Sequence, residues 1–165
     1  MKKIFIASDH AGFEIKNGLV EHFSQLLEDL GTNSNDRVDY PDFAHSLVNN
    51  INKNPNSKGI LICGTGVGMS IVANRNPKIR AGLAFNSEIA KIIRQHNDVN
   101  ILVLPGRFID IQEAIKCVDN FLETDFESGR HKKRIEKILM WFCCPQIIII
   151  KNLFSRQNNL RQKMF

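Results

Sequence analysis

The chain has 165 residues, 43% of them hydrophobic and 24% charged, and its formal net charge is +5. These values are typical of a soluble globular protein, and the length is sufficient for one domain with a sizeable buried core. No apolar run reaches membrane-spanning length, so the sequence excludes a transmembrane protein and we expect no membrane partner.

The cysteines exclude two further classes of protein. Cys63, Cys117, Cys143 and Cys144 show neither the spacing of a secreted disulfide framework nor the CxxC pair or Cys/His cluster of a zinc site. The N-terminal stretch "MKKIFIASDH" contains an apolar run too short for the core of a signal peptide. We therefore expect a cytoplasmic protein with free thiols and no metal site.

Short apolar runs alternate with segments of helical periodicity along most of the chain. Strands are predicted at "KIFIAS" (3–8), "GILIC" (59–63), "IRAGLAF" (79–85) and "VNILVLPG" (99–106). Helices are predicted within 9–31, 42–54, 69–76, 86–96, 110–124 and 130–142. Pro41 can open the second helix, and Asn86 or Ser87 can cap the fourth.

One segment of the first helical stretch is ambiguous. Phe13, Leu19, Phe23 and Leu27 recur at roughly helical spacing, but periodicity alone leaves "QLLEDL" (25–30) open between helix and strand. The alternation of strands and helices along the chain predicts an α/β fold, with a parallel sheet covered on both faces. Ligands of such sheets bind beyond the carboxyl ends of the strands, which gathers "SDH", "CGTGVG", "AFNSE" and "PGR" at one edge.

The segment "CGTGVG" (63–68) joins a predicted strand to a helix. Its glycines let backbone N–H groups approach an anion, although a plain tight turn needs the same residues. It lacks the Gly-Lys-Ser/Thr of a phosphate-binding P-loop and the spacing of a dinucleotide fingerprint. Cys63, near a helix N-terminus, can be a base or a nucleophile, whereas most single cysteines are small core residues.

Two other polar clusters carry groups suited to proton transfer. Asp9 and His10 end the first strand, where they can serve acid–base chemistry or cap the next helix. "RQHNDVN" places His96 and Asn97 in a loop after a helix and before a strand. A histidine there can act as general acid or base, or be an ordinary loop residue.

Basic residues gather late in the chain, between Arg130 and Lys163. Arg130 and Arg134 are four residues apart, so they share a helix face that suits a phosphate group, or a plain solvated basic face. Arg107 in "PGR" can join them at the carboxyl ends of the strands. Few aromatic residues interleave with the basic run, which argues against single-stranded nucleic acid as a partner.

Five ordered motifs resemble those of ribose-5-phosphate isomerase type B, a family that also includes isomerases of six-carbon sugar phosphates. They are "SDHAGFEIK", "DYPDFA", "GILICGTGVGMSIVAN", "RQHNDVNILVLPGR" and "GRHKKRIEKI". The resemblance covers residues 1–138 and implies a Rossmann-like three-layer α/β/α sandwich with a mostly parallel sheet of about five strands. It also favours a short strand for "QLLEDL".

The resemblance further implies an activity without metal or cofactor: interconversion of ribose 5-phosphate and ribulose 5-phosphate through an enediolate, in the pentose phosphate pathway. Cys63 would be the base, and His96, assisted by Asp9, would open the sugar ring. The oxyanion would be held by Thr65 and the backbone amides of Gly64, Thr65, Gly66, Val67 and Gly68. The phosphate would bind His10, Arg107, Arg130 and Arg134, the sugar Asn97, and Tyr40 would border the pocket.

The resemblance implies a homodimer, or a tetramer, whose sites are shared between subunits. Family branches use either the cysteine before the glycine turn or a glutamate just after it. Cys63 is present here and Met69 stands at the later position, so the chain resembles the cysteine branch. Residues 139–165 depart from the family, and Pro145 should interrupt a helix there, so an interface element and a disordered tail both stay open.

Two other functions remain as alternatives. An isomerase of allose or galactose 6-phosphate would share the chemistry and differ in pocket length. A nucleotide- or nucleic-acid-binding module would explain the basic bias, but it would leave Asp9, His10, Cys63 and His96 without a joint purpose.

Overall fold

The computed structural model describes residues 3–138 of the protein. The chain divides into two compact units, 1–128 and 129–165. The expectations for the tail, including Cys143, Cys144 and Pro145, lie outside the described residues.

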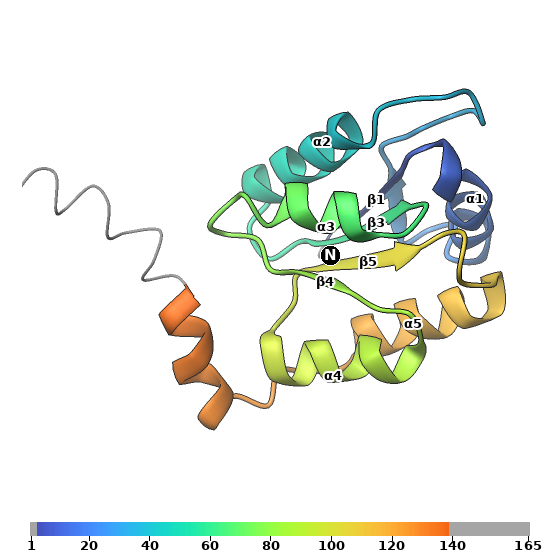
Figure 1. Ribbon diagram of the computed structural model, residues 1–165. Helices are drawn as coiled ribbons and strands as arrows, with labels where there is room; N and C mark the ends of the chain where they lie inside the picture. Colours follow the sequence, from blue (N-terminus) through green and yellow to red (C-terminus); the bar gives the residue numbers. More distant parts are fainter. Residues whose placement is uncertain (1–2, 139–165) are drawn as a thin grey trace, which may run out of the picture. The chain divides into compact units, whose positions relative to one another are not determined.

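The first unit is built on a five-stranded sheet in the order β2-β1-β3-β5-β4, and every neighbouring pair is parallel (Figure 1). The three central strands are buried, β1 and β5 throughout and β3 after Lys58, as expected for a sheet covered on both faces. The strands are β1 (Ile4–Ser8), β2 (Leu27–Asp29), β3 (Lys58–Cys63), β4 (Ala81–Leu83) and β5 (Ile101–Pro105).

Helices connect the strands and cover the sheet on both faces. After the short 3-10 turn η1 (His10–Gly12), they are α1 (Phe13–His22), α2 (Tyr40–Lys53), α3 (Val67–Ala73), α4 (Ser87–Asn97) and α5 (Ile111–Glu123). None of the helices within residues 3–138 combines the length and the apolar character needed to cross a membrane.

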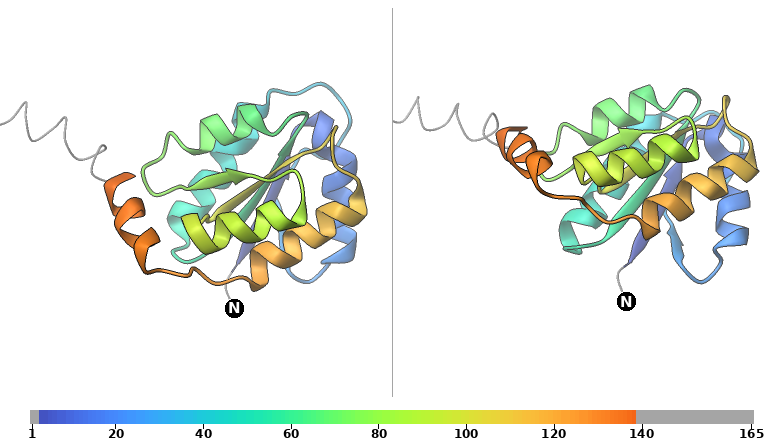
Figure 2. Two further views of the ribbon diagram at one scale, coloured as in Figure 1. Left: turned by 60° about the horizontal axis from the view of Figure 1, so that its bottom comes forward. Right: turned by 90° about the horizontal axis from the view of Figure 1, so that it is seen from below.

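Figure 2 shows helices on both faces of the sheet. Two hydrophobic clusters fill the space between the sheet and these helices. Successive strand residues point to opposite faces, so Ile60 and Ile62 join the cluster under α1, α4 and α5. Leu61 and Cys63 join the cluster under α2 and α3. The predicted three-layer α/β/α sandwich with a parallel sheet is confirmed, and Cys63 lies on the α2/α3 face.

Three local differences from the expected elements have simple causes. The helix after β1 ends at His22, because the chain turns at Phe23 and Leu27 enters β2, as the family resemblance implied. β4 is only three residues long, which periodicity could not delimit. The expected loop position of His96 and Asn97 is wrong: they are the last two residues of α4, which stops at Asp98 in the left-handed region.

The described part of the second unit is residues 129–138, of which 130–138 are helical. The predicted helix is confirmed over this range.

Candidate active site

Three loops meet where β1, β3 and β5 end, and we call this the carboxyl edge of the sheet. The backbone N–H of Asp9 donates to Ile62 O at 3.1 Å, and that of Gly106 donates to Cys63 O at 2.9 Å. The N–H of Arg107 donates to Gly64 O at 3.1 Å. The parallel register and these bonds therefore bring "SDH", "CGTGVG" and "PGR" together, as the sequence predicted.

Cys63 is the last residue of β3 and is 5% exposed. Its side chain belongs to the α2/α3 cluster, at the start of the glycine turn. Cys117 is the other described thiol: burial, with a smaller contribution from the Glu113 carboxylate, raises its pKa to about 12. Cys117 is therefore an inert core residue, while Cys63 sits at the edge where ligands of this fold bind.

The glycine turn owes its shape to Gly66. This residue has φ 76° and ψ −22°, in the left-handed region, and precedes the first residue of α3. A Cβ atom at Gly66 would also collide with the Leu83 side chain. The Thr65 hydroxyl accepts a bond from Val67 N at 3.4 Å, which closes the turn on itself. The first-turn N–H groups of α3 thus follow a residue that offers no capping side chain.

Tyr40 packs against this turn from the start of α2. A Cβ atom at Gly68 would lie 2.8 Å from Cε2 and Cζ of the Tyr40 ring, so only glycine allows the ring to approach this closely. The Tyr40 side chain stays partly exposed. The ring therefore forms one wall beside the glycine turn.

Asp9 and His10 are held by backbone groups of neighbouring loops. Asp9 Oδ1 accepts bonds from Ala11 N at 2.9 Å and Gly12 N at 3.1 Å, so the capping interpretation of Asp9 holds. His10 Nδ1 accepts a bond from Val38 N at 3.3 Å. Because Nδ1 is used as an acceptor, the Nε2 atom of a neutral His10 ring carries the proton and is available as a donor.

The Arg107 guanidinium lies over the backbone of Gly64. A Cβ atom at Gly64 would be 3.4 Å from Arg107 Nε. A cation thus stands at the carboxyl edge beside the cysteine and the glycine turn, where it can contact an anionic substrate.

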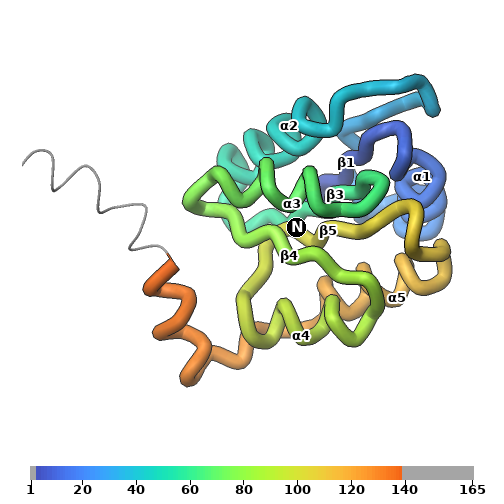
Figure 3. Tube along the Cα trace, viewed as in Figure 1, coloured from blue at the N-terminus to red at the C-terminus, as the bar shows by residue number. Residues whose placement is uncertain are grey.

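His96 and Asn97 lie at the opposite edge, which we call the amino edge. They end α4, which the chain leaves to enter β5 (Figure 3). β5 starts at Ile101, which pairs with Gly59 near the beginning of β3. Cys63, by contrast, pairs with Pro105 at the end of β5. Within a single chain His96 and Asn97 therefore stand at the opposite edge from Cys63, because a helix between parallel strands runs back along the sheet.

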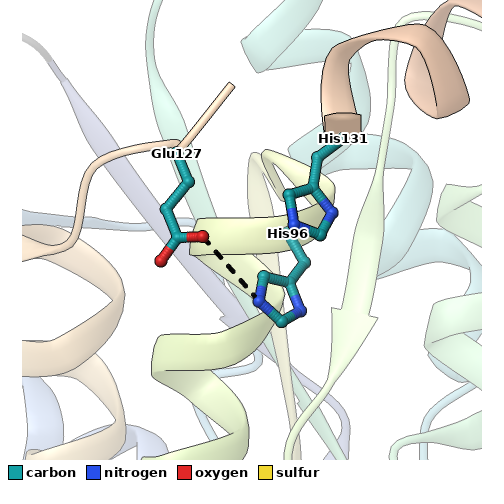
Figure 4. Close-up of side chains that lie close together, drawn as sticks. All are labelled: His96, Glu127 and His131. Atoms are coloured by element: carbon teal, nitrogen blue, oxygen red, sulfur yellow. Dashed lines mark ion pairs between the residues drawn. The ribbon is translucent and has the colours of Figure 1, made fainter. Parts of the chain in front are cut away.

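A carboxylate stands close to His96 at the amino edge. His96 Nε2 is 4.0 Å from Glu127 Oε2 (Figure 4), and Glu127 N donates to Gln95 O at 3.0 Å. The imidazole is 39% exposed. His96 is thus presented at the surface of the first unit.

Arg130 and Arg134 belong to the second unit. They occupy its helical residues 130–138, one turn apart, as their spacing predicted. Arg130 Nε also donates to His131 Nε2 at 3.3 Å.

Residues 4–138 match the family described as Ribose/Galactose Isomerase. A probable ribose-5-phosphate isomerase B of Mycoplasma pneumoniae is 47% identical over 142 residues, which cover 84% of this chain and 93% of that protein. The chain belongs to the ribose/galactose isomerase family. Ribose-5-phosphate isomerase B of Escherichia coli is 40% identical over 141 residues, covering 84% of this chain and 95% of that protein.

Solved structures of this isomerase family agree with the fold. A ribose 5-phosphate isomerase of Thermotoga maritima superposes with a TM-score of 0.80 at 50% identity, over 83% of this chain and 97% of that one. Ribose-5-phosphate isomerase B of Mycoplasma genitalium with bound ribulose-5-phosphate superposes with a TM-score of 0.82 at 43% identity, over 86% of this chain and 97% of that one.

Sequence reasoning about this isomerase missed the charged groups that surround its candidate site residues. At the end of α4, Asp98 bonds to both Arg80 and Arg94. Glu127 approaches His96. One signal was present: "HND" puts an aspartate directly after His96 and Asn97, where Asp is a favoured residue to end a helix in the left-handed region.

Proposed function

We propose that this protein interconverts ribose 5-phosphate and ribulose 5-phosphate, with Cys63 as the base. The observation that carries the proposal is the position of Cys63 at the carboxyl edge, directly before a glycine turn that opens α3. Membership of the isomerase family limits the chemistry to sugar isomerisation.

The reaction moves a proton between two neighbouring carbons. The Cys63 thiolate takes the proton from C2 of the open-chain aldose, and the electron pair forms a C1=C2 double bond while O1 becomes negative. Return of the proton to C1, with transfer of the O2 proton to O1, gives the ketose. Atoms and electrons balance within the sugar, so the proposed mechanism draws on no metal and no redox cofactor.

The negative charge on O1 needs donors that are already in place. Backbone N–H groups between Gly64 and Gly68 and the Thr65 hydroxyl are the groups that we assign to this oxygen. Gly66 places no side chain over the start of α3, and helix geometry leaves the first-turn N–H groups of α3 without intrahelical partners. Preorganised donors of this kind stabilise charge in the transition state at little cost of reorganisation.

His96 opens the furanose ring in this proposal, and it comes from a second copy of the chain. His96 and Asn97 stand at the amino edge, whereas Cys63 and Asp9 stand at the carboxyl edge. A homodimer, or a tetramer built from such dimers, can bring the amino edge of one copy against the carboxyl edge of the other. Asp9 then assists His96 across the interface, and Asn97 contacts the sugar.

Cations and a histidine donor bind the phosphate. His10 offers Nε2, since Nδ1 is occupied by Val38 N, and Arg107 stands beside Gly64. Arg130 and Arg134, one helical turn apart in the second unit, are assigned to the same phosphate on the strength of the family motif. Tyr40 borders the sugar beside the glycine turn.

A coupled assay tests the proposal. Purified full-length protein is offered ribose 5-phosphate, allose 6-phosphate and galactose 6-phosphate, each with and without EDTA. Turnover of the pentose phosphate that is indifferent to EDTA is expected. Preference for a hexose phosphate would overturn the substrate, loss of activity with EDTA would overturn the mechanism, and no turnover of any sugar would overturn the enzyme assignment.

A further inference from the structure

The end of α4 is held by one carboxylate placed between two guanidinium groups. Asp98 Oδ2 is 2.7 Å from Arg80 Nη2, and Asp98 Oδ1 is 2.9 Å from Arg94 Nη1. Each carboxylate oxygen therefore accepts from a different arginine. We infer that Arg80, Arg94 and Asp98 form a clamp that positions His96 and Asn97 for catalysis in the neighbouring subunit.

The arginines also hold the backbone around the two residues. Arg80 Nε donates to Asn97 O at 3.2 Å and to Asp98 O at 2.8 Å. Arg94 Nη1 donates to Val99 O at 2.7 Å. Because these carbonyl groups follow His96 directly, the clamp fixes the direction in which the last turn of α4 presents its side chains.

Arg94 anchors the clamp inside the protein. It is 8% exposed, and its Nε donates to Thr124 O at 3.3 Å, in the segment after α5. That segment also carries Glu127, which approaches His96. A buried guanidinium requires a partner for its charge, and Asp98 supplies it.

Asp98 meets a second requirement through its backbone. Its φ of 46° and ψ of 47° are left-handed, and its N–H donates to Arg94 O and Ile93 O, which ends the helix. Apart from glycine, Asn and Asp tolerate this conformation best. An aspartate at position 98 can therefore both end α4 after Asn97 and bridge two arginines.

This inference rests on the proposed function, in which His96 and Asn97 act on the sugar. If the clamp served only folding, its removal would lower the stability of the protein and would not act through these two side chains. If the clamp positions His96 and Asn97, its removal would lower turnover in the parent. It would lower turnover no further once both side chains were absent. The two roles therefore predict different effects on kcat when the Asp98 substitution is combined with loss of His96 and Asn97.

The experiment is a double-mutant cycle on the full-length protein. Asp98→Asn keeps a residue that tolerates the left-handed conformation but removes the charge that bridges the arginines. It is made in the parent and in a His96→Ala/Asn97→Ala background, and kcat and KM for ribose 5-phosphate are measured in all four proteins. We expect about a tenfold fall in kcat with little change in KM in the parent, and no further fall in the background.

Two further variants keep the test informative if Asp98→Asn folds poorly. Arg80→Lys retains a cation for Asp98, and Arg80→Gln does not, so kcat should be higher for Arg80→Lys. Lys3→Gln is the matched control, because it breaks a surface ion pair of 3.1 Å with Glu28 and should leave kcat unchanged.

The outcomes separate this inference from the proposed function. An equal fall in both backgrounds, or no fall in the parent, would overturn the clamp while leaving the isomerase intact. If His96→Ala/Asn97→Ala had parental activity, the roles of both residues and the clamp would fail together, although turnover by the parent would stand. Absence of turnover by the parent would instead defeat the proposed function.

Discussion

The two edges of the sheet use polar groups for opposite purposes. Helices begin at the carboxyl edge, where their N–H groups lack intrahelical partners, and they end at the amino edge, where carbonyl groups lack them. Side chains satisfy the starts of several helices: Asp9, Asn86 and Asp110 each accept bonds from first-turn N–H groups. α3 instead begins after Gly66, which has no side chain to offer, and of its first-turn N–H groups that of Val67 donates to the Thr65 hydroxyl at 3.4 Å.

Several lysine and arginine side chains at the amino edge bond to the protein itself. A cavity of about 380 Å³ there is lined by Lys58, Lys78, Arg80, Arg94 and Asp98, among others. Lys58 Nζ donates to Phe121 O at 3.0 Å and Leu122 O at 3.1 Å, which are carbonyl groups at the end of α5. Arg80 and Arg94 likewise bond to carbonyl groups around the end of α4.

The comparison shows that net charge is a poor guide to an anion site in this fold. Cations at the amino edge neutralise helix C-termini, which carry partial negative charge. At the carboxyl edge, helix N-termini supply positive potential from backbone N–H groups. The following predictions test this division between the edges.

Replacing Cys63 should have the largest effect. Cys63→Ala removes the proposed base, so kcat for ribose 5-phosphate should fall by about 10²- to 10⁴-fold while the dissociation constant of the sugar phosphate changes little. The coupled assay and titration calorimetry measure the two quantities. Cys117→Ala, at the buried thiol, is the control and should keep its kcat; near-normal turnover of Cys63→Ala would defeat the assignment.

Mixed dimers test whether one site uses both edges. Random pairing of co-expressed Cys63→Ala and His96→Ala chains makes half of the dimers mixed, each with one intact site, so activity should recover to about a quarter of the parental value. Cys63→Ala with Arg107→Ala is the control, because both residues belong to the carboxyl edge and no intact site forms. Equal recovery in the two mixtures would contradict a shared site.

A side chain at Gly66 should destabilise the carboxyl edge. Gly66→Ala meets a left-handed φ of 76° and the Leu83 side chain, so the free energy of unfolding should fall by about 2–3 kcal/mol in urea titrations. Gly129 has φ 53°, and a Cβ added there would have no heavy atom of the described residues beyond its chain neighbours within 4 Å, so Gly129→Ala isolates the conformational part and should cost about 1 kcal/mol. Equal losses would show that contact with Leu83 is unimportant.

Replacing Glu113 should have the smallest effect, a change in melting temperature that depends on pH. Its Oε1 accepts a bond from Ser87 N at 2.6 Å, and this bond lowers the pKa of Glu113 below its ordinary value of 4.5. A lowered pKa adds stability above the unfolded value, and that stability is lost as the pH falls through the folded value. Glu113→Gln should therefore melt a few degrees lower at neutral pH, and the difference should vanish in acid.

Lys116→Gln is the control for Glu113→Gln. Lys116 Nζ lies 3.8 Å from Glu113 Oε2 on an exposed turn of α5, so its loss should change the melting temperature little at any pH. A difference between parent and Glu113→Gln that grew as the pH fell would contradict the lowered pKa.

Much of the fold followed from local pattern. β1, β3 and β5 are apolar runs bounded by turns, and α4 and α5 have a periodic apolar face, so their positions were predictable. β2 and β4 were not delimited, because three residues hold too little periodicity. Asn86 as the cap of α4 was predictable, since its side chain accepts from Ile89 N through a purely local bond.

The candidate site was predictable only in part. Cys63 ends β3, and Asp9 and Arg107 come shortly after the ends of β1 and β5, so chain order alone brings the three residues to one edge. The copy of the chain that supplies His96 and Asn97 was not predictable, because a motif records which residues serve a reaction but not which subunit carries them.

By itself, the sequence determined the order of strands and helices, the edge at which Cys63 lies and the turn that follows it, since these depend on neighbours along the chain. The tertiary structure alone decided the contacts between distant segments. It placed Arg80 and Arg94 on either side of Asp98, Lys58 on the end of α5 and Tyr40 against Gly68. Such contacts join residues with no common periodicity, so packing of the helices on the sheet has to bring them together.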